Sequence, residues 1–373
     1  MRIAVGDPSG VTLFLCGDVM TGRGVDQILT HPSAPEIFEP SLRDARGYVA
    51  LAERASGPIP RPVAPGYIWG DALEELARAA PEVRIINLET SVTTWDEFRM
   101  DRSINYRMHP DNIACLTAAG IDVCVLANNH VLDYGYAGLE ETLDTLTTVG
   151  LKTTGAGRDI AEARRPAIID LANGHRVLVF AFGTRSSGIP QSWGATWNCP
   201  GVEFLADLSN ATADEILQRI DHARRPRDIV VASVHWGSNW GYEVPQAHVG
   251  FAHRLIDGGV DIVHGHSSHH PRPIEVYRNK LVLYGCGDFI DDYEGIPGFE
   301  AFRDDLVLMY LPALDPHNGE LLRLRMRPFR IRGMRLNRVS LEEAEWLRDT
   351  LHSVSCKFGA AVDLAGDGAL MLC

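Results

Sequence analysis

Four short polar segments of this sequence carry the carboxylate, amide and imidazole groups that bind divalent metal ions in proteins. Each segment directly follows a short apolar, mostly β-branched stretch, which is the pattern of a buried strand. The segments are Gly17-Asp18, Asn87-Leu88-Glu89, Asn128-Asn129-His130 and the histidine-rich run 264–270, and His235 follows a fifth such stretch at 229–234. Because an α/β sheet binds its ligands at the carboxyl ends of its parallel strands, we expect these groups to converge on one metal site.

The mixture of oxygen and nitrogen donors predicts one or two divalent ions, with manganese, zinc and iron as the candidates. The candidate ligands are six residues from these segments: Asp18, Glu89, Asn129, His235, His266 and His269. A two-ion site needs a carboxylate that bridges the ions. The two ions together polarise a substrate oxygen and lower the pKa of a bound water. Glu89 is the candidate for that bridge.

Four further residues are candidates for contact with a substrate. His130, next to Asn129, is placed to face the substrate as a general acid or oxyanion stabiliser, and Asp133 is a candidate for orienting its imidazole. Arg23 follows the first metal segment and Arg107 lies between the second and the third. A guanidinium at either place would bind a carboxylate or a phosphate.

Composition limits the classes of partner. The net charge of −14 argues against nucleic acid, because phosphate binding requires a basic face. The N-terminal residues lack the apolar core of a secretory signal, and no apolar run is long enough to predict a membrane span. The seven cysteines are scattered without a CxxC pair, and Cys16, Cys115, Cys124 and Cys286 stand in apolar stretches that predict core packing. We therefore expect a reduced, cytoplasmic protein.

The order of predicted elements indicates an α/β fold, since strands alternate with helical patterns along most of the chain. Strands are expected at 11–16, 83–88, 122–127, 176–182, 229–235, 260–264, 281–285 and 306–311, with a hairpin turn at 278–280. Residues 1–335 are predicted to form one large domain, and 336–373 a helix and short strands packed on it. Residues 31–66 hold seven prolines and are expected to be an insertion, either a surface excursion or a lid over the crevice.

Over residues 11–335 the motifs resemble those of the poly-γ-glutamate capsule biosynthesis protein A (CapA-type) family, a branch of the calcineurin-like metallophosphoesterases. The motifs are Gly17-Asp18-Val19-Met20, Asn87-Leu88-Glu89-Thr90, the segment 126–135 with Asn129-His130 and Asp133, Val234-His235-Trp236-Gly237 and the segment 264–275. The resemblance implies a four-layer α/β/β/α sandwich with a two-metal centre on its strand-end loops.

This chain departs from the pattern of metallophosphoesterases at three positions. Met20 stands where that pattern has a metal-binding histidine, and Glu89 replaces the usual bridging aspartate. The last motif, Gly265 to His269, is one residue wider than usual, so that His264 and His270 compete with His266 and His269 as ligands. The resemblance therefore implies that the ion held by Glu89, Asn129, His235 and His266 binds more tightly than one held by Asp18, Glu89 and His269.

These features predict a soluble metal-dependent hydrolase of the CapA type, in which a metal-activated water attacks a phosphoester or an amide bond. Family context adds a γ-glutamyl compound or another small molecule as the expected substrate. The alternative is a non-catalytic capsule-assembly or ligand-binding protein that retains the metallophosphatase fold. Met20 favours the alternative, whereas the intact Asn129-His130-Asp133 unit favours catalysis.

Overall fold

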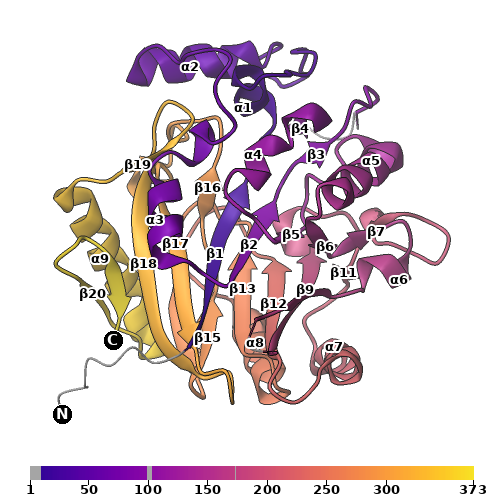
Figure 1. The fold of residues 1–373 in the computed structure, drawn as a ribbon, viewed down its shortest axis with the longest axis vertical. Coiled ribbons are helices and arrows are strands. Elements are labelled where there is room, and N and C mark those ends of the chain that lie inside the picture. Colours follow the sequence, from indigo (N-terminus) through magenta and orange to yellow (C-terminus); the bar gives the residue numbers. More distant parts are fainter. Residues whose placement is uncertain (1–9, 99–102, 173) are drawn as a thin grey trace.

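The computed structural model describes residues 10–98, 103–172 and 174–373 and shows a layered α/β sandwich (Figure 1). Within the described chain, the two large sheets have ten and seven strands. Helices pack on the outside of each sheet, and an apolar core fills the space between the sheets. The predicted metallophosphoesterase-like α/β sandwich is confirmed.

The larger sheet contains the N-terminal strands and the C-terminal strands side by side. In sheet order its strands are β20 (Val362–Leu364), β21 (Leu370–Leu372), β18 (Leu321–Ile331), β17 (Leu306–Leu314), β1 (Val11–Val19), β2 (Val83–Leu88), β5 (Val123–Val125) and β6 (Lys152–Thr154). In addition, β16 (Asp288–Ile290) pairs with β1, and β19 (Leu336–Arg338) pairs with β18. Strands β1, β2, β5 and β16 run parallel, so their carboxyl ends lie at the same edge.

The smaller sheet supplies the second set of parallel strands. Its order is β11 (Phe204–Leu205), β9 (Arg176–Thr184), β12 (Ile229–His235), β13 (Ile262–His266), β15 (Lys280–Leu283) and β14 (Ile274–Tyr277), with β8 (Ala167–Asp170) paired to β9. Strands β14 and β15 form the predicted hairpin, and Arg278 and Asn279 turn it with φ values of 48° and 62°. Strand β13 starts and ends two residues later than predicted, so that it includes His266.

Side-chain alternation along the strands of the smaller sheet explains its two apolar faces. Alternate residues of β9 face the space between the sheets, namely Val177, Val179 and Ala181. The intervening residues Leu178, Phe180 and Phe182 pack under α7 (Asn210–Ala223) and α8 (Gln246–Asp257). By the same alternation, Ser233 and His235 of β12, like His264 and His266 of β13, lie on the inner face.

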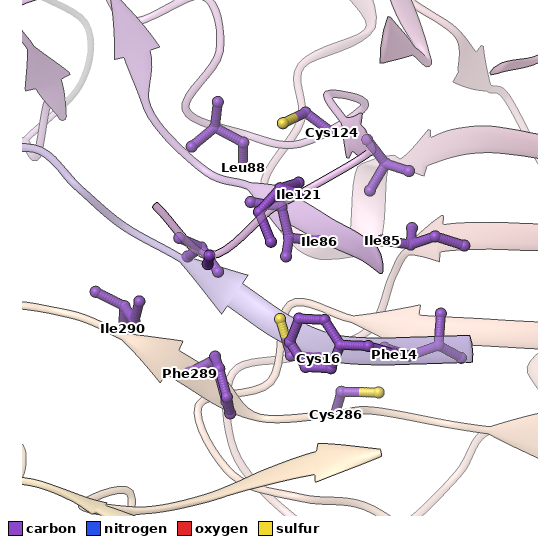
Figure 2. Close-up of a cluster of buried hydrophobic side chains, with 14 of the residues drawn as sticks. Phe14, Cys16, Ile85, Ile86, Leu88, Ile121, Cys124, Cys286, Phe289 and Ile290 are labelled. Atoms are coloured by element: carbon purple, nitrogen blue, oxygen red, sulfur yellow. The ribbon is translucent and has the colours of Figure 1, made fainter. Parts of the chain in front are cut away.

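The larger sheet is covered by helices whose apolar sides join the main core cluster. They are α3 (Ala72–Ala79), α4 (Ala114–Thr117) and α5 (Gly135–Thr148). Figure 2 shows part of this cluster around β1, where Phe14 lies close to Phe289 with ring centroids 5.8 Å apart. Cys16, Cys124 and Cys286 lie in the same cluster, and Cys115 is also buried. The expected core packing of these four cysteines is confirmed.

Segment 31–66 contains α2 (Arg46–Ser56), which follows α1 (Arg23–Ile28) and lies with it at the top of the molecule in Figure 1. At the other end of the chain, α9 (Leu341–Ser355) leads into β20 and β21 of the larger sheet. The hydroxyl of Ser355 in α9 accepts a hydrogen bond from the amide of Ile274 in the smaller sheet. The C-terminal segment thus contacts both sheets.

Short elements complete the described chain. They are β3 (Ser91–Val92), β4 (Arg107–Met108), β7 (Ala156–Gly157), α6 (Ile160–Ala163), β10 (Gly201–Val202) and the 3-10 turns Tyr67–Trp69, Pro110–Asn112, Arg185–Ser187, Gln191–Trp193, Glu300–Phe302 and Cys356–Phe358.

Candidate metal centre

The candidate metal ligands come from both sheets. Asp18 lies at the end of β1 in the larger sheet, whereas His235 and His266 are the last residues of β12 and β13 in the smaller one. His235 and His266 are direct neighbours in the strand register, which puts their imidazoles side by side on the inner face. The two sheets therefore each supply part of one site, rather than a single sheet supplying all of it.

Three of the six predicted ligands form a compact group. One ligand atom each from Asp18, His235 and His266 lies within 4.8 Å of the others, and all three side chains are buried. Nδ1 of His266 is 3.8 Å from Oδ1 of Asp18 and 2.7 Å from Nδ1 of His235. One carboxylate and two imidazoles suit zinc, manganese or iron, so the residues at this position fit a divalent ion.

Glu89 and Asn129 border this group. The side-chain oxygen of Asn129 is 2.9 Å from Nε2 of His235, and Oε2 of Glu89 is 4.0 Å from the same nitrogen. The amide of Asn87 donates hydrogen bonds to both carboxylates, at 2.7 Å to Asp18 and 3.2 Å to Glu89. Asn87 was absent from the predicted site, although it lies near the end of β2, two residues before Glu89.

The electrostatics of this pocket also fit a cation. Burial, followed by the neighbouring carboxylate of Asp288, raises the pKa of Asp18 to about 7. Burial and the nearby Asp18 raise the pKa of Glu89 well above its ordinary value. Carboxylates that are buried together destabilise each other's charged form. A divalent ion would offset that repulsion.

His264 and His266, which compete as predicted ligands, differ in their hydrogen-bond partners. The Ser233 hydroxyl is 2.9 Å from Nε2 of His266 and 3.1 Å from Nδ1 of His264. The other nitrogen of His264 donates to the carbonyl of Cys16 at 2.7 Å and so ties β13 to β1. Both ring nitrogens of His264 are therefore engaged, one within its own sheet and one across to the other sheet. His270 lies outside the group as well and stacks on Phe302, with ring centroids 4.6 Å apart.

The predicted acid–base pair has a geometry suited to its expected role. Nδ1 of His130 lies 2.6 Å from Oδ2 of Asp133, which also accepts the amide of Tyr106 at 2.8 Å. The ring stands edge-on to Tyr106, with centroids 4.6 Å apart. Nε2 of His130 is 3.8 Å from Oε1 of Glu89. Asp133 thus orients the imidazole so that Nε2 faces the candidate metal centre.

His269 is placed differently from His266, although only three residues separate them. Its Nδ1 lies 2.9 and 3.1 Å from the two carboxylate oxygens of Asp288, and its Nε2 lies 2.8 Å from the Asn239 side chain. The hydroxyl of Tyr293 donates to Asp288 at 2.6 Å and is 3.2 Å from Nδ1 of His269. Among the described residues, His269 is not part of the compact group with Asp18.

Asp288 and Tyr293 were not among the predicted site residues, although they stand in a polar strand-end loop, 285–293, that the sequence predicts to border the same crevice. Asp288 begins β16 and is paired in register with Asp18 of β1. Gly17 allows this close approach, since a Cβ there would stand 1.7 Å from the carbonyl oxygen of Gly287. The available signal for Asp288 was its place just after an apolar strand and the two glycines Gly285 and Gly287. The pairing of β16 with β1 gave no local signal.

The two predicted substrate-binding arginines are both engaged within the protein. Arg23 forms a bidentate pair with Asp292 at 2.5 and 3.0 Å, and its Nη1 reaches Glu39 at 2.9 Å and Tyr48 at 3.1 Å. Arg107 donates to the Trp95 carbonyl and to Asp96, and it lies outside the walls of the large cavity. Arg23 thus links α2 and the preceding segment to the loop after β16. Substrate binding by either arginine stays a prediction.

A cavity of about 700 Å³ opens beside the candidate metal centre. Its inner wall includes Glu89, Asn129, His130 and His269. Its outer wall comes from α2 and from loops. The apolar and aromatic side chains there are Met20, Tyr48, Leu51, Ala52, Ala55, Ile104, Tyr106, Tyr293, Ile296 and Pro297, and the polar ones include Arg23, Ser41, Ser103, Asp292 and Glu294. The segment 31–66 therefore lines the cavity rather than projecting away from it.

No helix within the described ranges is long and apolar enough to cross a membrane.

The fold and the grouped side chains define a metallophosphoesterase-like sandwich with a candidate metal centre at its strand ends. Residues 12–293 match the family described as bacterial capsule synthesis protein PGA_cap, and the chain belongs to that family. The resemblance to CapA-type proteins found from the motifs is thereby confirmed.

Relatives from bacteria carry related names. A probable polyglutamine synthesis accessory protein of Mycobacterium tuberculosis (strain H37Rv) is 50% identical over 366 residues, covering 98% of this chain and 96% of that protein. The PGA biosynthesis protein CapA of Bacillus subtilis is 28% identical over 79% of this chain and 66% of its own length. The capsule biosynthesis protein CapA of Bacillus anthracis is 25% identical over 80% of this chain and 63% of its own length.

Proposed function

We propose that this protein is a divalent-metal-dependent hydrolase that cleaves an amide, γ-glutamyl or phosphoester bond in a small substrate. The observation that carries the proposal is the grouping of Asp18, His235 and His266 within 4.8 Å of one another. This group lies beside a cavity of about 700 Å³ that is lined by His130. Glu89 and Asn129, which border this group, line the same cavity as His130, and the cavity is large enough for a small molecule.

A bound ion would lower the pKa of water and polarise the substrate oxygen. The other steps fall to side chains of the chain itself. His130 holds a proton at Nε2 for the leaving group, while its Nδ1 donates to Asp133 at 2.6 Å. The attacking water gives a proton to the carboxylate of Glu89 and forms the new bond to carbon or phosphorus, while the bond to the leaving amine or alkoxide breaks and that group takes the proton from His130. Glu89, which is 3.8 Å from Nε2 of His130, then returns the water's proton to this nitrogen. Asp133 keeps the ring in the orientation that this transfer requires.

The substrate proposal rests on the names of relatives. The Bacillus proteins are named for PGA and capsule biosynthesis, and the Mycobacterium protein for polyglutamine synthesis. A γ-glutamyl amide is therefore the first substrate to test. The apolar and aromatic side chains of the outer wall suit the organic part of a small molecule.

The test is a panel of γ-glutamyl amides, phosphomonoesters and phosphodiesters, assayed with manganese-, zinc- or iron-loaded protein. We expect turnover of at least one class that disappears with a chelator and returns with the metal. The matched control is His222→Ala, which changes an exposed histidine on α7 and leaves the candidate site intact.

The second candidate is a non-catalytic accessory protein that uses the same cavity to hold a ligand. Two observations favour it: the word "accessory" in the name of the Mycobacterium relative, and Met20 in place of a metal-binding histidine. It predicts metal and ligand binding without turnover. Equilibrium binding of a γ-glutamyl peptide combined with an inactive panel would support it over the hydrolase.

A further inference from the structure

The predicted second metal position, which would use Asp18, Glu89 and His269, does not fit the side chains that surround it. Both ring nitrogens of His269 already have polar neighbours within 3.2 Å. Both ring nitrogens of His235 and of His266 have polar neighbours as well. Those two histidines converge with Asp18, with one ligand atom of each within 4.8 Å of the others, whereas within the described residues no such group of three includes His269.

Tyr293, which lines the cavity, contacts both His269 and Asp288 through its hydroxyl. Its hydroxyl is hydrogen-bonded to Asp288 at 2.6 Å, and the sulfur of Met20 lies 4.0 Å from that hydroxyl. Met20 is buried and stands where metallophosphoesterases place a histidine ligand. An apolar thioether and a phenol thus occupy the side from which a further ligand would be supplied.

The first position, in contrast, has the composition of a complete single-ion site. Asp18, His235 and His266 provide one carboxylate oxygen and two imidazole nitrogens. Catalytic zinc sites that hydrolyse amide bonds use this same set of two histidines and one carboxylate, with a fourth position open to water. Two-ion sites instead clamp the attacking and leaving oxygens of a phosphoryl group between ions about 3.5–4 Å apart.

We propose that this chain binds one divalent ion, that the hydrogen-bonded set His269–Asp288–Tyr293 takes the place of a second, and that the substrate is an amide rather than a phosphoester. This inference rests on the proposed hydrolase function and narrows its substrate class. His269 and Tyr293 both line the cavity, so the set also fixes the cavity wall beside the candidate metal centre. Asp288 is a positioning residue that holds both side chains.

The test is the metal stoichiometry of the full chain, with Mn²⁺ alone as the probe. Chelator-treated protein is reloaded, freed of excess ion by gel filtration, and measured by elemental analysis and electron paramagnetic resonance. We expect about one Mn²⁺ per chain with the spectrum of an isolated ion, since two ions about 3.5–4 Å apart would be magnetically coupled. Two ions per chain with a coupled spectrum would overturn the inference.

Matched variants locate the ion. His266→Ala should lose the bound Mn²⁺, whereas His269→Ala and Tyr293→Phe should each retain about one per chain. Thermal unfolding of each variant separates loss of metal from loss of fold, and Tyr293→Phe keeps the aromatic ring if His269→Ala does not fold. Loss of an ion in folded His269→Ala would also overturn the inference.

A pair of substrates separates this inference from the proposed function beneath it. With loaded wild-type protein, we expect kcat/KM for a γ-glutamyl anilide to exceed that for bis-nitrophenyl phosphate by at least about 10²-fold. The reverse preference would overturn the amide assignment and leave the metal-dependent hydrolase standing. A chain that binds no metal at all would contradict the proposed function itself.

Discussion

His266 and His269 stand three residues apart in one histidine-rich run, yet they lie in opposite surroundings. His266 faces His235, Asp18 and the hydroxyl of Ser233, whereas His269 lies between the carboxylate of Asp288 and the side chain of Asn239. The first histidine therefore belongs to the candidate metal centre, called the metal side below, and the second to a hydrogen-bonded side. Residue type and spacing do not distinguish the two histidines. The residues that β12 and β16 place beside them do.

The largest effect is expected from removing a ligand on the metal side. His235→Ala should lose bound metal and turnover together, with metal affinity falling by at least roughly 10²-fold, because even groups that only support a ligand cost 10–100-fold. Metal content and kcat/KM are measured on the same preparation, with His222→Ala as the control. If His235→Ala kept its metal, the metal side would have to be assigned to other residues.

His130→Ala should fail in a different way. We expect turnover to fall by roughly 10²–10⁴, because a proton donor acts only in the transition state. Metal content should stay unchanged, since His130 is outside the compact ligand group. Full activity of this variant on a substrate that needs metal would refute the role given to His130.

On the hydrogen-bonded side, Arg23 is expected to matter for stability. Its guanidinium is buried with Asp292 and Glu39, and removing one partner of such a group leaves buried charge without compensation. Arg23→Met should therefore lower the free energy of unfolding by about 3–5 kcal/mol.

The matched control is Arg46→Met, which removes an exposed surface ion pair with Asp44 and should leave the free energy of unfolding nearly unchanged. Urea unfolding of both variants measures the difference. Equal stabilities would show that the Arg23 cluster does not anchor α2 as its contacts indicate.

The smallest effect is expected on the pH dependence of stability, through His248, which packs beside the metal side. His248 stacks on Trp236, next to His235, and burial followed by the nearby Arg272 lowers its pKa to about 4. The unfolded chain binds a proton at this histidine below about pH 6.5 and the folded chain only near pH 4, so stability is lost as pH falls between these values. The loss from His248 alone should be about 2 kcal/mol at pH 5 relative to pH 7.

His248→Phe keeps an aromatic ring on Trp236 and removes this titration. Its free energy of unfolding should therefore fall less than that of the wild type between pH 7 and pH 5. Identical pH dependence in the two proteins would show that His248 titrates normally in the folded state.

The sequence predicted the parts of the site that depend on local pattern. Asp18, Glu89 and His235 each follow an apolar strand, and the strand ends are where the structure places them. Strand β13 was predicted to end at His264 because histidine and glycine break the apolar pattern. It continues to His266 since Ser233 and the carbonyl of Cys16 satisfy the polar rings on its inner face.

The remaining parts depend on pairing between distant residues. Asp288 reaches the site because β16 pairs with β1, which is some 270 residues earlier in the chain. The carboxylate that neutralises Arg23 is likewise 269 residues away, at Asp292. Neither pairing has a local signal, so the sequence predicted substrate binding by two arginines and a metal ligand at His269. Three-dimensional pairing gives all three side chains other contacts.

The most direct test of the central claim is metal-dependent turnover by the wild type and His235→Ala, measured side by side on the same γ-glutamyl amide and phosphodiester substrates. Chelator-treated wild-type protein should be inactive and should regain activity when Mn²⁺ or Zn²⁺ is added, whereas His235→Ala should stay inactive at the same metal concentration. Turnover that is undiminished in the metal-free wild type, or equal in the two loaded proteins, would contradict a metal centre built on Asp18, His235 and His266.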